Sequence, residues 1–152
     1  MSAQMCDRIR CCGGEYYLAA TPLEDYFVLH PDLRPSFQGF HTGCVRGYIG
    51  EWAVHGSELY LTGLRMVLST DATFGTLFPD AGAKGVFADW VSGDLKCPHG
   101  KIVKSVHAGF ASIWEEELHL FFENGILLRA EERRNDVTES GDAGGGRAAC
   151  SV

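Results

Sequence analysis

The dipeptide Asn124-Gly125 constrains the fold of this chain more than any other local feature, because it separates two runs of alternating apolar residues. The first run extends from Ile113 to Phe122 and the second from Ile126 to Glu132. Asn and Gly adopt the positive φ angles of a two-residue hairpin turn at little cost, so this pattern is the strongest short-range signal for a β-hairpin. We therefore predict two antiparallel strands joined by a tight turn.

A second hairpin is predicted upstream, where residues 48–54 and 59–64 flank the turn His55-Gly56-Ser57. Residues 86–91, 94–97 and 101–107 also have the composition of strands, with a turn or bulge at 92–93 and a break at 98–100. Nineteen glycines are scattered along the chain and clustered near its end. Scattered glycines suit the tight turns between many short strands, and so favour a mainly β fold.

One short helix is predicted near the N-terminus, where the sequence reads Thr21-Pro22-Leu23-Glu24. Thr21 suits the N-cap, Pro22 suits the first helical position, and Glu24 can complete a capping box. Pro31 ends the pattern, so the helix should cover residues 22–30. The fold class that follows is mainly β, with α+β as the alternative. We expect a curved antiparallel sheet or an open β-barrel with this one short helix.

The length of 152 residues fits one domain. Residues 1–14 are polar and end in two glycines, so we predict a flexible arm there. Residues 135–152 contain three consecutive glycines and almost no apolar side chain. Such a segment buries too little surface to become ordered alone, so we predict a flexible glycine-rich tail. Residues 15–134 are then a single β-rich domain.

The formal net charge of −7 limits the classes of partner. Nucleic acids are held largely by Lys and Arg, and the chain has only four lysines, so we expect no nucleic-acid partner. A basic protein partner is favoured instead. We expect no membrane partner, because no stretch approaches the ~18 apolar residues of a membrane helix. No signal peptide is evident, so the expected location is the cytoplasm, where the six cysteines should be thiols.

Aromatic residues on or beside the predicted strands suggest a ligand pocket, since a curved sheet lined by such rings can enclose a small molecule. The alternative is that the rings only fill the core. Three polar residues nearby could anchor the ligand. The predicted ligand-binding residues are Tyr48, Trp52, Trp90 and Trp114, with Arg46, Asp89 and His107 as anchors.

A weaker alternative is a metal site, because His41 and Cys44, and likewise Cys97 and His99, each place two good zinc ligands close together in sequence. The same cysteines could instead act as thiolate nucleophiles activated by a histidine. Neither pair has the spacing of a known zinc knuckle, and no local sequence matches a known nucleophile motif. We therefore expect no metal and no cofactor.

The stretch from Cys44 to Glu131 resembles a group of small uncharacterised bacterial proteins. The resemblance rests on five short segments: Cys44–Trp52, Leu59–Leu61, Leu77–Pro79, Phe87–Gly93 and Val106–Phe110. Small proteins of this sort can be carried on mobile gene cassettes. The resemblance implies a bacterial, mainly β protein, and it brings no activity and no catalytic residue.

The sequence therefore favours a non-enzymatic binding protein, for either a small ligand or a protein partner. The alternative is a metal- or cysteine/histidine-dependent enzyme of unknown reaction. A homodimer is a further expectation, because exposed strand edges or an apolar sheet face could pair two copies.

Overall fold

Both predicted hairpins are present in the computed structural model, which describes residues 3–104, 109–110 and 112–135. Strands β7 (Ile113–Glu123) and β8 (Ile126–Arg134) are joined by Asn124 and Gly125, whose φ angles are 49° and 80°. Two consecutive positive φ angles are those of a type I′ turn, which suits the twist of a hairpin. Strands β3 (Tyr48–His55) and β4 (Glu58–Met66) form the upstream hairpin.

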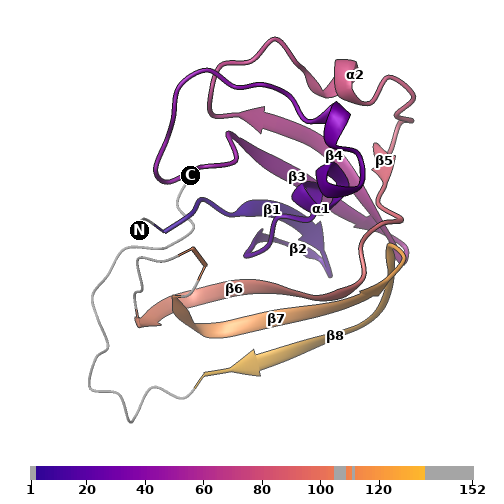
Figure 1. Cartoon of the computed structure of the whole chain (residues 1–152). Coiled ribbons are helices and arrows are strands. Elements are labelled where there is room, and N and C mark those ends of the chain that lie inside the picture. The colour runs from indigo at the N-terminus through magenta and orange to yellow at the C-terminus, as the bar shows by residue number, and fades with distance from the viewer. Residues whose placement is uncertain (1–2, 105–108, 111, 136–152) are drawn as a thin grey trace.

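The two hairpins belong to one sheet of eight strands, in the order β2-β1-β3-β4-β8-β7-β6, with β5 paired to β4. The remaining strands are β1 (Asp7–Cys11), β2 (Gly14–Leu18), β5 (Val86–Phe87) and β6 (Gly93–Lys104). Neighbouring strands are antiparallel except for β1 and β3, which are parallel. Figure 1 shows that the sheet curls into two halves, with β3 and β4 in one and β6, β7 and β8 in the other.

The halves are joined where the hairpin turns meet. Glu58 pairs with Ile126, and the Leu59 amide donates to the Gly125 carbonyl at 2.9 Å. At the opposite margin the Ala19 amide, just after β2, donates to the Lys96 carbonyl of β6 at 2.9 Å. The sheet is nevertheless not closed. The prediction of a mainly β fold, with a curved sheet and a short helix, is confirmed.

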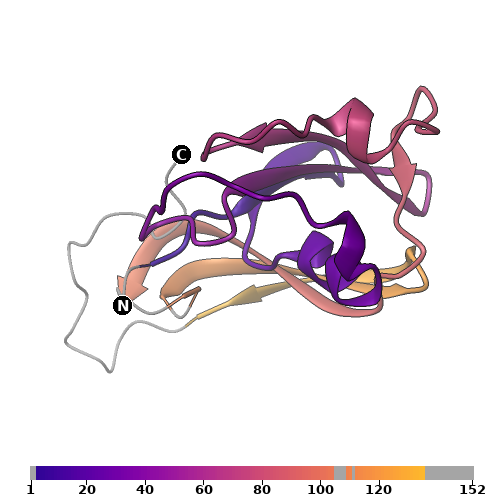
Figure 2. The same cartoon turned by 45° about the horizontal axis from the view of Figure 1, so that its top comes forward.

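The predicted helix is α1 (Pro22–Leu29), which lies beside the curled sheet in both views (Figures 1 and 2) and buries Leu23 and Phe27. The predicted capping box is wrong, because the Thr21 side chain makes no cap hydrogen bond. The Glu24 carboxylate instead accepts from Tyr48 and Arg34. Two shorter helical segments follow, η1 (Pro31–Leu33) and α2 (Phe74–Leu77). Neither α-helix of the described residues is long and apolar enough to cross a membrane.

Several predicted boundaries need correction. Residues 1–14 are not a loose arm, because residues 7–11 form β1, which pairs with both β2 and β3. Residues 98–100 do not break the chain: β6 continues through them, and the irregularity is a register shift between His99 and Ile102. Only Val86 and Phe87 of the strand predicted over 86–91 are extended and paired. The predicted tail lies outside the described residues from residue 136 onward.

The main core fills the space between the two halves of the sheet. Apolar side chains from nearly every element pack there, and most are less than one-tenth exposed. Its members include Ile9, Leu18, Leu23, Phe27, Tyr48, Trp52, Leu61, Leu95, Cys97 and Leu120. Alternation along β7 explains the division of faces: Leu118 and Leu120 point into this core, while Glu117 is only partly buried.

Candidate functional site

The buried carboxylate of Asp7 accepts hydrogen bonds from β3 and from the loop before β3. Asp7 is fully buried and accepts three hydrogen bonds, from Arg46 Nη2 at 2.7 Å, from the Gly50 amide at 2.8 Å and from Trp52 Nε1 at 3.0 Å. Gly50 leaves the necessary room, since a Cβ atom there would lie 2.7 Å from Asp7 Oδ2. The carboxylate is therefore held by three donors that converge from different parts of the sequence.

The Asp7–Arg46 ion pair lies almost entirely out of solvent, with side chains 0% and 5% exposed. Burial raises the pKa of Asp7, and this rise is opposed by the charge of Arg46 and by the hydrogen bonds from Gly50, Trp52 and Arg46. Arg46 Nε is buried with no hydrogen-bond partner among the described residues. Burying an ion pair costs desolvation energy that attraction only partly offsets, so such a pair suggests a role beyond stability.

A second polar layer, centred on Glu24 of α1, lies next to Arg46. The Tyr48 hydroxyl donates to Glu24 Oε2 at 2.5 Å, and Arg34 Nη1 lies 2.6 and 2.8 Å from the two carboxylate oxygens. Arg34 Nη2 in turn donates to the Arg46 carbonyl at 3.5 Å, and the Arg46 guanidinium lies over the Tyr48 ring at 5.5 Å. Burial and the bond to Glu24 raise the pKa of Tyr48. Tyr48 is therefore a neutral hydrogen-bond donor.

A cavity of about 370 Å³ opens beside these two layers. This volume lies within the ~300–1,000 Å³ typical of small-ligand sites. We call it the Arg34–Arg46 cavity. Its lining residues include two arginines and one glutamate beside the apolar Val45 and Phe110, so it could hold a ligand with an anionic group and an apolar body. It is lined by Gln4, Thr21, Glu24, Arg34, Val45, Arg46, Gly109 and Phe110.

Of the predicted ligand-binding residues that the structure describes, only Arg46 lines this cavity. Tyr48 and Trp52 are buried in the main core, and Trp90 packs edge-on against Trp52 with 6.3 Å between ring centroids. Trp114 lies in a separate cluster with Cys6, and Phe110 packs against that cluster. The structure thus brings Arg46, Tyr48 and Trp52 together around Asp7 but leaves Trp114 apart. Asp89 is exposed, and His107 lies outside the described residues.

The structure does not assemble the predicted zinc ligands. Among the described residues, no group of three or more His, Cys, Asp or Glu side chains is placed to hold a metal ion. Cys44 is buried and its Sγ contacts the Tyr48 carbonyl, whereas His41 is exposed and accepts from the Gly43 amide. Cys97 is part of the main core. His99 lies instead between two carboxylates, 3.2 Å from Glu116 and 3.1 Å from Glu132.

The expectation that the cysteines are thiols is confirmed at four positions of the described chain and wrong at one. Cys11, Cys12, Cys44 and Cys97 are free, and Cys6 is disulfide-bonded.

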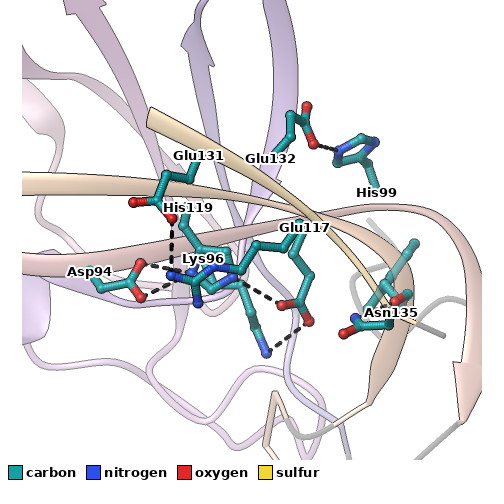
Figure 3. Close-up of polar contacts among 10 residues, drawn as sticks. Asp94, Lys96, His99, Glu117, His119, Glu131, Glu132 and Asn135 are labelled. Carbon is teal, nitrogen blue, oxygen red and sulfur yellow. Dashed lines mark hydrogen bonds and ion pairs between the residues drawn. The ribbon is translucent and has the colours of Figure 1, made fainter. Parts of the chain in front are cut away.

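A histidine that the sequence did not single out lies between two carboxylates on the sheet of β6, β7 and β8 (Figure 3). His119 Nδ1 lies 2.9 Å from both oxygens of Asp94, and Nε2 lies 3.0 Å from Glu117 Oε1. Lys96 lies on the other side of Glu117, with its Nζ 3.8 Å from Glu117 Oε2. Both ring nitrogens of His119 therefore contact carboxylates, and the contact with Asp94 joins β7 to β6.

Sequence reasoning missed three residues of the candidate site. Glu24 was interpreted only as part of a helix cap, Arg34 was assigned no role, and Asp7 was placed in a loose arm. The signal that could have found Asp7 is its alternation with Ile9 and Cys11, which places all three on one face of a strand.

Comparisons of the chain with protein-family models, with curated proteins and with solved structures returned no match.

Proposed function

We propose that this protein is a non-enzymatic binding protein for a small ligand that carries a carboxylate or a similar anion on an apolar body. The observation that carries the proposal is the presence of two arginines, Arg34 and Arg46, in the lining of the Arg34–Arg46 cavity. A guanidinium group binds carboxylates in a fixed geometry and is suited to buried ion pairs. Val45 and Phe110 supply apolar wall.

Arg34 is the residue whose substitution best tests whether the negative charge of the ligand contributes to binding. Its side chain is 36% exposed, so an entering anion can reach it, and its present partner is Glu24. An anionic ligand would compete with Glu24 for this guanidinium. Substitution of Arg34 should therefore lower the affinity for the ligand, whereas substitution of Glu24 should raise it. A general effect on folding would instead change the affinity in the same direction in both variants.

The test compares phenylacetate with its uncharged amide, phenylacetamide, by isothermal titration calorimetry. We expect the protein to bind phenylacetate and to bind phenylacetamide at least tenfold more weakly, because a hydrogen bond to a charged group contributes ~1.5–3 kcal/mol. Arg34→Gln should weaken phenylacetate binding, and Glu24→Gln should strengthen it. Equal affinity for the acid and the amide, or the same change in both variants, would contradict the proposal. A thermal-shift screen of other carboxylates would then identify better ligands.

A second candidate function is the binding of a protein partner, a second copy of this chain included. Large apolar side chains that are exposed concentrate between residues 28 and 45 in the described part of the chain: Val28, Leu29, Leu33, Phe40 and Val45. Exposed apolar surface of this kind marks interaction sites. Sedimentation of the wild type against Leu29→Glu and Phe40→Glu tests for a homodimer. A dimer that the two substitutions dissociate supports this function, whereas a monomeric wild type removes the homodimer and leaves a basic partner, as favoured by the net charge of −7.

A cytoplasmic location is also proposed, because four cysteines of the described chain are free thiols, as is usual in a reducing compartment. A bacterial origin on a mobile gene cassette is proposed because of the resemblance described above.

A further inference from the structure

Two consecutive cysteines lie at the turn between β1 and β2, and their sulfur atoms are 3.1 Å apart. Successive side chains of an extended strand point to opposite faces, which would separate the two sulfurs. Cys12 departs from that geometry, because its φ of 55° lies in the left-handed region that few non-glycine residues adopt. The turn therefore places the two thiols side by side at a backbone cost, as is common where strain serves a function.

The two thiols differ in exposure. Cys11 ends β1 and is only 5% exposed, whereas Cys12 is exposed. A cavity of about 450 Å³ opens at this turn and is lined by both cysteines together with Arg10, His55 and Val54, among others. The pair is therefore accessible from one side and backed by the core on the other. A reagent would meet Cys12 first and Cys11 second.

The separation of the sulfurs indicates which chemistry the pair can perform. It exceeds the ~2.05 Å of a disulfide bond, so these are two separate thiols. One ion at ~2.3 Å from each sulfur, a typical metal–thiolate distance, would bridge 3.1 Å with an angle near 90° at the ion. That angle is narrower than a tetrahedral site requires and matches the pyramidal geometry of trivalent arsenic.

We propose that Cys11 and Cys12 form a dithiol site that chelates trivalent arsenicals. In the reaction with an organoarsenic oxide, R–As=O, each thiol gives up its proton and forms one S–As bond. The As–O bonds break, and the oxygen leaves with the two protons as one molecule of water. Arsenic stays trivalent and neither sulfur is oxidised, so the reaction requires no oxidant or reductant. The site is independent of the Arg34–Arg46 cavity, which shares no lining residue with it.

The test uses phenylarsine oxide on the full-length protein with the Cys6 disulfide left intact, which the intact mass verifies, and intact-mass spectrometry in an excess of a monothiol such as glutathione. A single S–As bond exchanges with the monothiol, whereas a chelate persists because the second bond forms intramolecularly. We expect one adduct on the wild type. Cys12→Ser should weaken binding roughly 100-fold or more, the lower range of the gain from linking two binding events. Cys11→Ser should do the same, and ethanedithiol should remove the adduct.

Cys44→Ala is the matched control, because it removes a lone buried thiol and leaves the pair intact. Its adduct should equal that of the wild type. Cys12 is exposed, so Cys12→Ser should keep the fold, which circular dichroism can verify. A wild-type adduct that glutathione removes as readily as it does from Cys12→Ser overturns the proposal, and so does an adduct that survives in Cys12→Ser.

Discussion

Asp7 and Arg46 are 39 residues apart in sequence, yet Asp7 Oδ1 and Arg46 Nη2 lie 2.7 Å apart inside the protein. The contact ties the start of β1 to the loop that leads into β3. Since β1 and β3 are parallel, no hairpin turn can set their junction, and the ion pair holds it instead. The same arginine lines the Arg34–Arg46 cavity, so the contact also positions the candidate site.

Removing the carboxylate should therefore be strongly destabilising. Asp7→Ala leaves the Arg46 cation buried without its partner, and loss of one partner of a buried pair costs ~3–5 kcal/mol. Urea unfolding measures the change in the free energy of unfolding. Arg8→Ala is the control, because its partner Glu15 is half exposed and such pairs contribute at most ~1 kcal/mol. A cost for Asp7→Ala no larger than that of Arg8→Ala would show that the buried pair does not hold β1 in place.

The turn of the β7–β8 hairpin should tolerate no side chain at Gly125. A Cβ atom there would lie 2.5 Å from the Ala88 carbonyl oxygen, and the φ of 80° is itself unfavourable for an L-residue by ~1–2 kcal/mol. Gly56 separates the two effects, because its φ is 63° but nothing lies within 4 Å of its Cβ position. We expect Gly125→Ala to lower the midpoint of urea unfolding clearly more than Gly56→Ala does. Equal shifts would mean that the backbone near Ala88 yields to the added methyl group.

Local chemistry explains what could be predicted from the sequence. The Asn124-Gly125 turn and the helix at Pro22 depend on neighbouring residues, so their signals are complete within a few positions. Strand β1 was missed although it forms a hairpin with β2, because its apolar face contains only Ile9 and Cys11 beside a buried carboxylate. Its other partner, β3, is some forty residues away. The alternation of Asp7 with Ile9 and Cys11 places the carboxylate on the buried face of β1, but no local pattern identifies its partner Arg46.

In the candidate site, too, local sequence signals could be predicted, whereas contacts between distant parts of the chain could not. Arg46 was identified because it stands among aromatic residues in the sequence, but the direction of those rings depends on how the sheet curls. The alternation of Trp52 with its neighbours along the strand fits a core residue and a pocket residue equally well. Only the folded structure shows that its indole donates to Asp7.

The two threonines that precede helices should differ in their contribution to stability. Thr73 accepts from the Thr76 amide in a complete capping box, whereas Thr21 makes no side-chain cap bond. Thr73→Ala should therefore cost ~1 kcal/mol, the typical value of an N-cap. Thr21→Ala should stay within ~0.5 kcal/mol, as for a substitution that removes no specific contact. Thermal unfolding of both variants provides the comparison, and the reverse order would restore the predicted capping box at Thr21.

Alkaline pH should weaken the fold through Cys97. Burial raises the pKa of its thiol to about 12, against ~8.5 in an unfolded chain. Below the unfolded value both states hold the proton, so Cys97 adds no pH dependence. Between the two values the native state keeps a proton that the unfolded state releases, so the free energy of unfolding falls as pH rises, by ~1.4 kcal/mol per pH unit. Urea unfolding from about pH 7.5 to about pH 10 measures this slope.

Cys97→Ala should remove this contribution to the slope. Leu95→Ala weakens the same core without removing a thiol, so it should leave the slope unchanged. An unchanged slope in Cys97→Ala would mean that Cys97 ionises as readily in the folded protein as in the unfolded chain.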